Sequence, residues 1–226
     1  MGVSLVPATQ WQLIMQLTMA GIMRAEGAEK ITIVIEEGIN GELGAFDSVI
    51  MSILAQNAPP GDVFEFGTYL GRTTRQLAMR RPQSTVFTID CQDSEGRAIQ
   101  RGRPSDAPFC AIPRADIGKA FRGTPEEERI IQLWGDSQHY ELDEFHGSMG
   151  IVFVDGGHDY ETALSDLRHA RAMLADPAGG IIAAHDYGLI PDVMHAWEEV
   201  FQDAETLAFE ASTVVAYGEI ARNVFG

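Results

Sequence analysis

Residues 63–74 read VFEFGTYLGRTT, and this stretch decides the fold. Val63 to Phe66 is typical of a short buried strand, and Gly67 allows a tight turn where that strand ends. Gly71 opens the next helical pattern and lets a ligand approach the backbone. A buried carboxylate is costly without hydrogen bonds, so we expect Glu65 to face a ligand crevice at the strand's end, or else to be held by a backbone amide.

Four more apolar runs follow at helix-length intervals, over residues 86–89, 130–133, 151–154 and 180–184. Near-continuous apolar strands separated by helices are typical of a parallel sheet that is covered on both faces. Residues 160–174 carry a helical apolar stripe, and the late runs 206–209 and 213–217 are expected to pair as a hairpin. The sequence therefore predicts an α/β fold: a doubly wound, mostly parallel, Rossmann-like sheet with helices on both faces and a C-terminal antiparallel hairpin.

The first 60 residues are expected to form an N-terminal helical extension, a cap over 1–60 that precedes a main domain over 61–226. Residues 46–54 place apolar side chains on one helical face, and residues 57–61 end that helix. Trp11 to Met23 is interpreted as a helix because it lacks the basic start and cleavage site of a signal peptide. Residues 31–35 fit a short strand or a helical turn. The N-terminal helices are expected either to close a pocket or to form the face of a homo-oligomer.

The amino-acid composition limits the kinds of partner and the location that we expect for the protein. The chain of 226 residues has 33 acidic and 16 basic side chains and a net charge of -17, which disfavours nucleic acid as a partner. No apolar run is long enough to span a membrane. Cys91 and Cys110 are too few for a disulfide scaffold or a zinc cluster, so we expect free thiols and a cytoplasmic location.

Polar residues follow each predicted strand, at the edge where open parallel sheets bind ligands. Asp90 ends the second strand about 20 residues after the glycine turn, where an acid can accept both hydroxyls of a ribose. Asp136 and Ser137 end the third strand and fit either a contact to an adenine amino group or a helix N-cap. The glycine turn and Asp90 together favour a nucleoside-type ligand. A nicotinamide dinucleotide fits poorly, because position 73 is threonine where a third glycine is needed.

Two further clusters follow the fourth and fifth strands. Neighbouring parallel strands lie about 4.8 Å apart, so Asp155, His185 and Asp186 are expected to converge at one point. Two carboxylates and an imidazole can hold a divalent metal ion or flank a general base. The alternative is that the two acids cap the helices that follow.

Four stretches together resemble the class I S-adenosylmethionine-dependent methyltransferases, and in particular the methyltransferase domain 24 family, which is related to the macrocin O-methyltransferase group. They are residues 64–74, 135–137, 153–161 and 179–187. The resemblance implies that residues 61–226 bind S-adenosyl-L-methionine, with the methionine end at the glycine loop, the ribose at Asp90, the adenine at Asp136 and Ser137, and the transferring methyl beside Asp155. The implied cofactor-binding residues are Glu65, Gly67, Thr68, Tyr69, Gly71, Thr73, Asp90, Asp136, Ser137 and Asp155.

The chain departs from the family pattern at two positions. Many relatives read Asp-Gly-Asp where this chain has Asp155-Gly156-Gly157, and metal-dependent relatives carry two adjacent acids where it has His185-Asp186. Both changes weaken the case for magnesium, because magnesium prefers oxygen ligands. The expected metal ligands, if a divalent ion binds, are Asp155, His185 and Asp186.

The resemblance implies methyl transfer to an oxygen of a small-molecule acceptor, with Asp155 beside the transferring methyl group. The candidate general base is His158, three residues after Asp155 at the mouth of the same pocket, because a histidine with a near-neutral pKa suits proton removal. His185 is the second candidate base, and a solvent-facing ring at a helix start is the alternative for His158. The competing functional hypothesis is a non-catalytic S-adenosylmethionine-binding protein or a metal-dependent oxygenase-like relative. Seven basic residues between positions 93 and 129 fit a solvated helix face or a lid that recruits an anionic acceptor.

Overall fold

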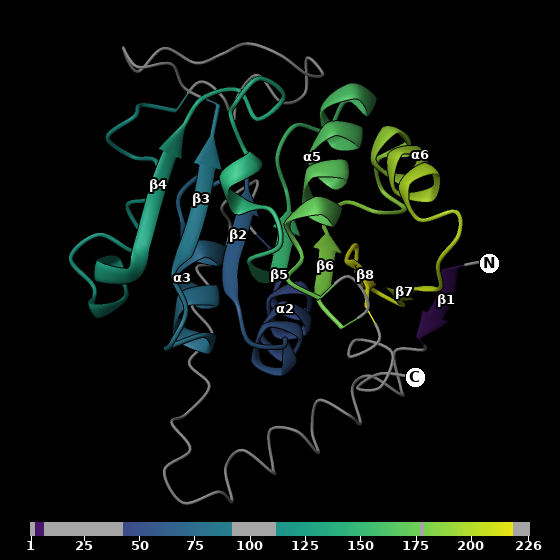
Figure 1. The fold of residues 1–226 in the computed structure, drawn as a ribbon, viewed down its shortest axis with the longest axis horizontal. Helices are drawn as coiled ribbons and strands as arrows, with labels where there is room; N and C mark the ends of the chain where they lie inside the picture. The colour runs from purple at the N-terminus through teal and green to yellow at the C-terminus, as the bar shows by residue number, and fades with distance from the viewer. Residues whose placement is uncertain (1–2, 7–42, 92–111, 177–178, 219–226) are drawn as a thin grey trace, which may run out of the picture.

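The computed structural model describes residues 3–6, 43–91, 112–176 and 179–218. Within them, eight strands form one sheet in the order β1-β7-β8-β6-β5-β2-β3-β4. Figure 1 shows β4 at one edge of this sheet and β1 at the other. The strands are β1 (Val3–Val6), β2 (Asp62–Phe66), β3 (Val86–Asp90), β4 (Ile130–Trp134), β5 (Met149–Val154), β6 (Ile181–Ala184), β7 (Thr206–Phe209) and β8 (Val215–Tyr217).

Only β8 runs antiparallel to its neighbours β6 and β7, and the remaining pairs are parallel. The predicted mostly parallel sheet with a C-terminal antiparallel hairpin is therefore confirmed. The chain adds β3 and β4 on one side of β2, then returns to add β5 and β6 on the other. This reversal places a topological switch point between β2 and β5, where open α/β sheets bind their ligands. The edge strand β1, which pairs with β7, was not predicted.

Helices cover both faces of the sheet, as predicted. Alternation along β5 explains how, since Ile151 and Phe153 pack into one core while Val152 and Val154 pack into the other. The first core contains α2 (Ala45–Asn57) and α3 (Arg72–Arg80), and the second contains α5 (Tyr160–Met173) and α6 (Pro191–Val200). Two short 3-10 helices, η1 (Pro125–Arg129) and η2 (Asp143–Phe145), complete the described elements.

Helix α2 forms where the apolar stripe predicted it, but the buried face is rotated. Phe46 is 48% exposed, while Asp47, Ile50 and Leu54 are buried. The spacing i, i+3, i+7 therefore puts an acid on the buried stripe of this helix. The proposed division of the chain at residue 60 stays a prediction, although α2 shares its hydrophobic core with the sheet.

Several predictions fall outside the described residues. These are the helix from Trp11 to Met23, residues 31–35, Cys110, residues 92–111 of the segment that follows Asp90, and with them the roles expected of the N-terminal helices. Among the residues that the structure does describe, no helix is long and apolar enough to cross a membrane.

Candidate active site

The glycine turn after β2 meets the end of β5 at the switch point. The Asp155 N–H donates to the Phe66 carbonyl over 2.9 Å, and the Gly67 N–H donates to the Ile89 carbonyl over 3.0 Å. Gly67 has a φ of 93°, and a Cβ placed there would lie 2.0 Å from the Asp155 carbonyl oxygen. Only glycine satisfies both the backbone angle and this close approach, so Gly67 allows the two strand ends to touch.

Asp90 holds the glycine loop from the end of β3. Its Oδ2 accepts the Tyr69 N–H over 2.8 Å, and Tyr69 has a φ of 45°, in the left-handed region that side chains rarely adopt. Burial raises the pKa of Asp90 to about 6, although hydrogen bonds from the backbone of Tyr69 and Cys91 oppose the shift. Asp90 is thus placed at the predicted strand end, with one oxygen already committed to the loop. Its contact to a ribose stays a prediction.

Glu65 is fully buried, which differs from the expected position facing a crevice. Its Oε2 accepts hydrogen bonds from the hydroxyls of Thr74 and Thr88. The Thr88 hydroxyl in turn lies 2.8 Å from that of Thr68, inside the glycine loop. Two threonine hydroxyls therefore donate to Glu65 Oε2. Through them Glu65 of β2 is connected to α3, to β3 and, by way of Thr88, to the glycine loop. Thr73 lies partly buried in the first turn of α3.

The loop after β4 carries Asp136 and Ser137. Asp136 accepts the Gln138 N–H over 3.2 Å and lies 3.0 Å from His139 Nδ1, so it shapes a tight turn. Both predicted residues lie at the carboxyl edge of the sheet, and their contact to adenine stays a prediction. Sequence reasoning missed Asp166 of α5, a buried acid near Asp136 and Ser137.

Asp166 lies beneath the loop that follows β5. A Cβ on Gly156 would lie 3.0 Å from Asp166 Oδ2, so the bare glycine leaves room for this carboxyl group. Burial raises the pKa of Asp166 to about 8. The negative charges of Asp136 and Asp159 add to the shift, and the nearby Ser137 hydroxyl opposes it. Neither Asp166 oxygen makes a hydrogen bond of good geometry with the described residues, so the neutral acid is favoured at pH 7.

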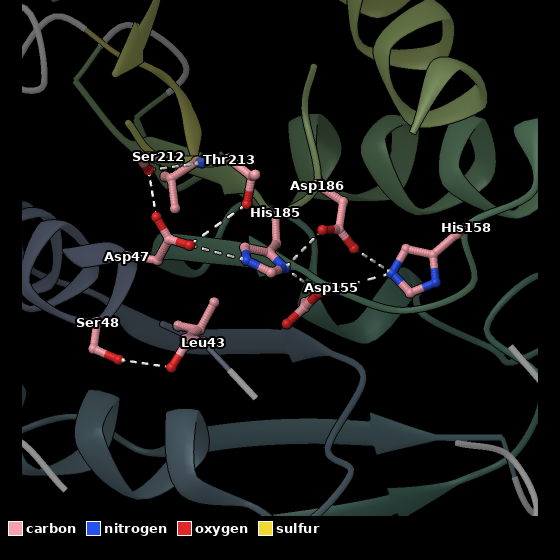
Figure 2. Close-up of polar contacts among 10 residues, drawn as sticks. Leu43, Asp47, Ser48, Asp155, His158, His185, Asp186, Ser212 and Thr213 are labelled. Atoms are coloured by element: carbon pink, nitrogen blue, oxygen red, sulfur yellow. Dashed lines mark hydrogen bonds and ion pairs between the residues drawn. The ribbon is translucent and has the colours of Figure 1, made fainter. Parts of the chain in front are cut away.

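Asp155, His185 and Asp186 converge as predicted. His185 Nδ1 lies 3.2 Å from Asp155 Oδ1 and 3.4 Å from Asp186 Oδ1 (Figure 2). One donor atom from each of the three side chains lies within 4.8 Å of the others, so the described residues include a group that could hold a metal ion. The side chains are 18%, 15% and 14% exposed, in that order, which leaves the group within reach of a ligand.

His158 joins the same group from the loop before α5. Its Nε2 lies 2.9 Å from Asp186 Oδ2 and 4.0 Å from Asp155 Oδ1. The ring is 18% exposed, so the alternative of a ring that faces solvent does not describe it. In Figure 2 its second nitrogen points away from the two carboxylates. Asp186 itself has a φ of 60°, a strained backbone angle that accompanies this arrangement.

The far side of His185 is held by a residue that sequence reasoning missed. His185 Nε2 lies 3.3 Å from Asp47 Oδ2, and Asp47 also accepts hydrogen bonds from the hydroxyls of Ser212 and Thr213. The sequence feature that could have pointed to Asp47 is its i, i+3, i+7 spacing with the buried apolar residues of α2. Ser212 and Thr213 precede β8 and gave no signal of their own. We call Asp47, Asp155, His158, His185 and Asp186 the acid–histidine cluster.

Charge sets the protonation of His185. Burial alone would lower its pKa, but the charge of Asp155 and hydrogen bonds to Asp155 and Asp47 raise the pKa of His185 to about 11. Burial would likewise raise the pKa of Asp47, yet hydrogen bonds from His185 and Ser212 lower it below its ordinary value. Without a bound metal ion, His185 is therefore an imidazolium at neutral pH. An imidazolium cannot accept a proton, which argues against His185 as the general base.

The basic side chains of residues 112–129 contact other described residues of the protein. Arg129 donates to the carbonyls of Ala78, Arg81 and Ser84 at the end of α3. The Arg114 guanidinium lies 4.0 Å from the centre of the Trp134 ring. Arg122 donates to carbonyls of its own loop, and Lys119 lies 3.9 Å from Asp116. The described part of the segment forms turns and the 3-10 helix η1 instead of the expected solvated helix face, and recruitment of an anionic acceptor stays a prediction. The other three basic residues lie outside the described ranges.

Comparison with known proteins assigns the chain to a family. The sequence pattern of the methyltransferase domain 24 family matches residues 64–187, which is more than half of the chain, so the protein belongs to this methyltransferase-domain family. A search of curated proteins found no significant match.

Solved structures share the fold at low sequence identity. The calicheamicin methyltransferase CalS11 has a TM-score of 0.59 and 14% identity, covering 92% of each chain. The methyltransferase PaMTH1 from Podospora anserina, solved with S-adenosylhomocysteine, has a TM-score of 0.53 and 12% identity, covering 90% of this chain and 86% of that one. This similarity confirms the Rossmann-like methyltransferase fold.

Proposed function

We propose that the protein is an S-adenosylmethionine-dependent methyltransferase that methylates an oxygen atom of a small molecule. The observation that carries this proposal is the gathering of the acid–histidine cluster at the switch point, next to the glycine loop, in a chain of a methyltransferase family. A net charge of -17 makes nucleic acid an unfavourable acceptor.

The residues fit the cofactor. S-adenosylmethionine carries a positively charged sulfonium that supplies an electrophilic methyl group when bound. The carboxylates of Asp155 and Asp186 attract such a cation, and their partial exposure leaves them accessible. Gly67 and Gly71 shape the loop above them, and Asp90 fixes that loop through the Tyr69 N–H. Glu65 accepts a hydrogen bond from the Thr88 hydroxyl, which in turn contacts the Thr68 hydroxyl of the loop.

His158 is the proposed general base. Asp186 Oδ2 lies 2.9 Å from His158 Nε2 and orients the ring, which leaves Nδ1 as the nitrogen that removes the acceptor's hydroxyl proton. Asp155, 4.0 Å from the same ring, stabilises the imidazolium that forms. The second acid of many relatives is absent, since position 157 is glycine. A histidine base one position later supplies the missing function.

Two arrangements can offset part of the negative charge of the three acids in the cluster. In the arrangement that we propose, the His185 imidazolium does so through both ring nitrogens. In the competing arrangement, Asp155, His185 and Asp186 hold a divalent ion, which would act as a Lewis acid on the acceptor oxygen. The imidazolium is favoured because His185 contacts all three carboxylates of the cluster.

Cofactor binding and methyl transfer test the proposal separately. Calorimetry with S-adenosylhomocysteine measures binding, and incubation with S-adenosylmethionine and a panel of hydroxylated small molecules measures release of S-adenosylhomocysteine. Failure to bind S-adenosylhomocysteine would overturn the cofactor assignment. Binding without methyl transfer to any acceptor would favour the non-catalytic binding protein.

A further inference from the structure

We infer that Asp47 is a positioning residue of the active site: it holds the His185 ring so that Nδ1 faces Asp155 and Asp186. This inference rests on the proposed function for its consequence in turnover, but its geometry stands on the described residues alone. Asp47 lies outside the segment 64–187 that matches the family. Nothing in that match assigns it a role.

The contacts of Asp47 are specific. Asp47 lies in the first turn of α2, where an acid commonly interacts with the helix dipole, and no side-chain hydrogen bond caps that helix. Its carboxylate instead points across to His185 Nε2, 3.3 Å away, and to the hydroxyls of Ser212 and Thr213 (Figure 2). Three separate parts of the chain therefore meet at this one buried carboxylate.

An imidazole has two nitrogens, and the partner of one decides where the other points. With Asp47 at Nε2, the ring presents Nδ1 to Asp155 Oδ1 at 3.2 Å and to Asp186 Oδ1 at 3.4 Å. Asp186 then contacts His158 through its other oxygen, at 2.9 Å. Asp47 thus orients the proposed base through two intervening side chains.

The Ser212 hydroxyl fixes Asp47 in turn. The same Ser212 oxygen accepts the Val214 N–H over 3.0 Å, so its donation to Asp47 is set by the turn before β8. The strand that runs antiparallel in the sheet is therefore connected to the methyl-transfer site. Ser212→Ala should weaken the orientation of His185 less than a change at Asp47, because Asp47 would keep its contact with the ring.

The test uses Asp47→Asn, which preserves shape, and Asp47→Ala, which removes the contact. Ser48→Ala is the matched control, since Ser48 is the next buried residue of α2 and its hydroxyl lies near the Leu43 carbonyl. Nitrogen-15 NMR of the histidine rings, with His185 assigned from a His185→Asn sample, reports the Nε2 environment directly. Calorimetry with S-adenosylhomocysteine and thermal unfolding show whether the fold and the cofactor site remain.

We expect the His185 Nε2 resonance to move in both Asp47 variants and to stay in place in Ser48→Ala. Loss of the outer partner of a metal-bound histidine costs about 10- to 100-fold, and by analogy we expect kcat to fall by a similar factor here. Affinity for S-adenosylhomocysteine should change by less than about twofold. An unchanged Nε2 resonance in a folded Asp47→Ala variant overturns the inference. If the wild type transfers no methyl group, the proposed function fails, yet the NMR result still decides whether Asp47 orients His185.

Discussion

Thr162 occupies the space beside Gly157 that a side chain at that position would need. A Cβ on Gly157 would lie 2.7 Å from Thr162 Cγ2, closer than real Cβ atoms approach. Thr162 cannot simply turn away, because its hydroxyl contacts Gln138 Nε2 and Asp159 Oδ2 at 2.8 and 2.7 Å. The packing around position 157 therefore leaves no room for the second acid of the Asp-Gly-Asp pattern.

This packing predicts that Gly157→Asp restores the family motif without restoring its chemistry. Overpacking of this kind costs about 1–3 kcal/mol, so the free energy of unfolding should fall by that amount. Adding Thr162→Ala should recover much of the loss, because it removes the Cγ2 that the new side chain meets. Urea unfolding of the single and double variants measures both effects. Equal stability of Gly157→Asp and the wild type would show that the helix start shifts freely.

Replacing His158 should abolish proton removal while leaving the cofactor site intact. General-base catalysis contributes about 10²- to 10⁴-fold, so His158→Gln should lower kcat by that factor. Affinity for S-adenosylhomocysteine, measured by calorimetry, should stay close to that of the wild type. His146→Gln is the matched control, since His146 is exposed and contacts only Asp143 among the ion pairs of the described residues. Full turnover in His158→Gln would remove His158 from the mechanism.

Asp90 should make cofactor binding depend on pH. The pKa of Asp90 is raised to about 6, so its carboxylate gains a proton as the pH falls from 7 to 5. Affinity for S-adenosylhomocysteine should fall over that window. In Asp90→Asn, affinity should be at least about tenfold weaker at pH 7.5, the equivalent of one charge-assisted hydrogen bond, and should vary little with pH. Calorimetry at pH 5, 6 and 7.5 tests this, and equal affinities for the two proteins would exclude a ribose contact.

Asp166 should make stability fall as the pH rises. Its pKa is raised from 3.8 to about 8 in the folded state, so folding favours the protonated acid. The stability that this group contributes is full below about pH 4 and is lost as the pH rises toward 8. The free energy of unfolding of Asp166→Asn, relative to that of the wild type, should rise by up to about 1.4 kcal/mol for each pH unit across that window.

Thermal and urea unfolding between pH 5 and pH 9 measure this difference. Glu144→Gln, which neutralises an exposed acid, is the control and should show no comparable trend. A wild type and an Asp166→Asn variant whose stabilities run parallel with pH would mean that Asp166 is ionised in the folded protein.

His185 should replace a metal ion, so turnover should survive an excess of chelator. His185→Asp converts this cation to an acid and should create a site for magnesium or manganese, because hard cations prefer carboxylate oxygens. Isothermal titration with each metal should show binding to His185→Asp and much weaker binding to the wild type. If chelation abolishes wild-type turnover and added metal restores it, the divalent ion is the correct arrangement.

The strands were predictable because their patterns are local. β2, β3, β4, β5 and β6 are apolar runs placed between helical stripes, and the ends of each lie within two residues of their expected positions. The strand ends were predictable for the same reason, which is why Asp155, His158, His185 and Asp186 were found from the sequence. Chain order and the rule for parallel sheets suffice to bring them to one edge.

Contacts between distant segments were not predictable in this way. Asp47 looks like an ordinary first-turn acid until the rotation of α2 is known, and Phe46 was expected on the buried face instead. Glu65 was expected to face a ligand crevice or to be held by a backbone amide, but it is fully buried and its Oε2 accepts from Thr74 of α3 and Thr88 of β3. Asp166 stands in a helical pattern where an exposed acid is usual, and only the folded structure shows the space left by Gly156.

The position of Asp47 and Ser212 outside residues 64–187 limits how the family segment can be transplanted. A chimaera that grafts this segment onto another scaffold would carry Asp155, His158, His185 and Asp186, but nothing opposite His185 Nε2. Its imidazole could then rotate, and the two acids beside the proposed base would lose their fixed partner. An engineered swap should therefore exchange α2 and the turn before β8 together with the segment itself.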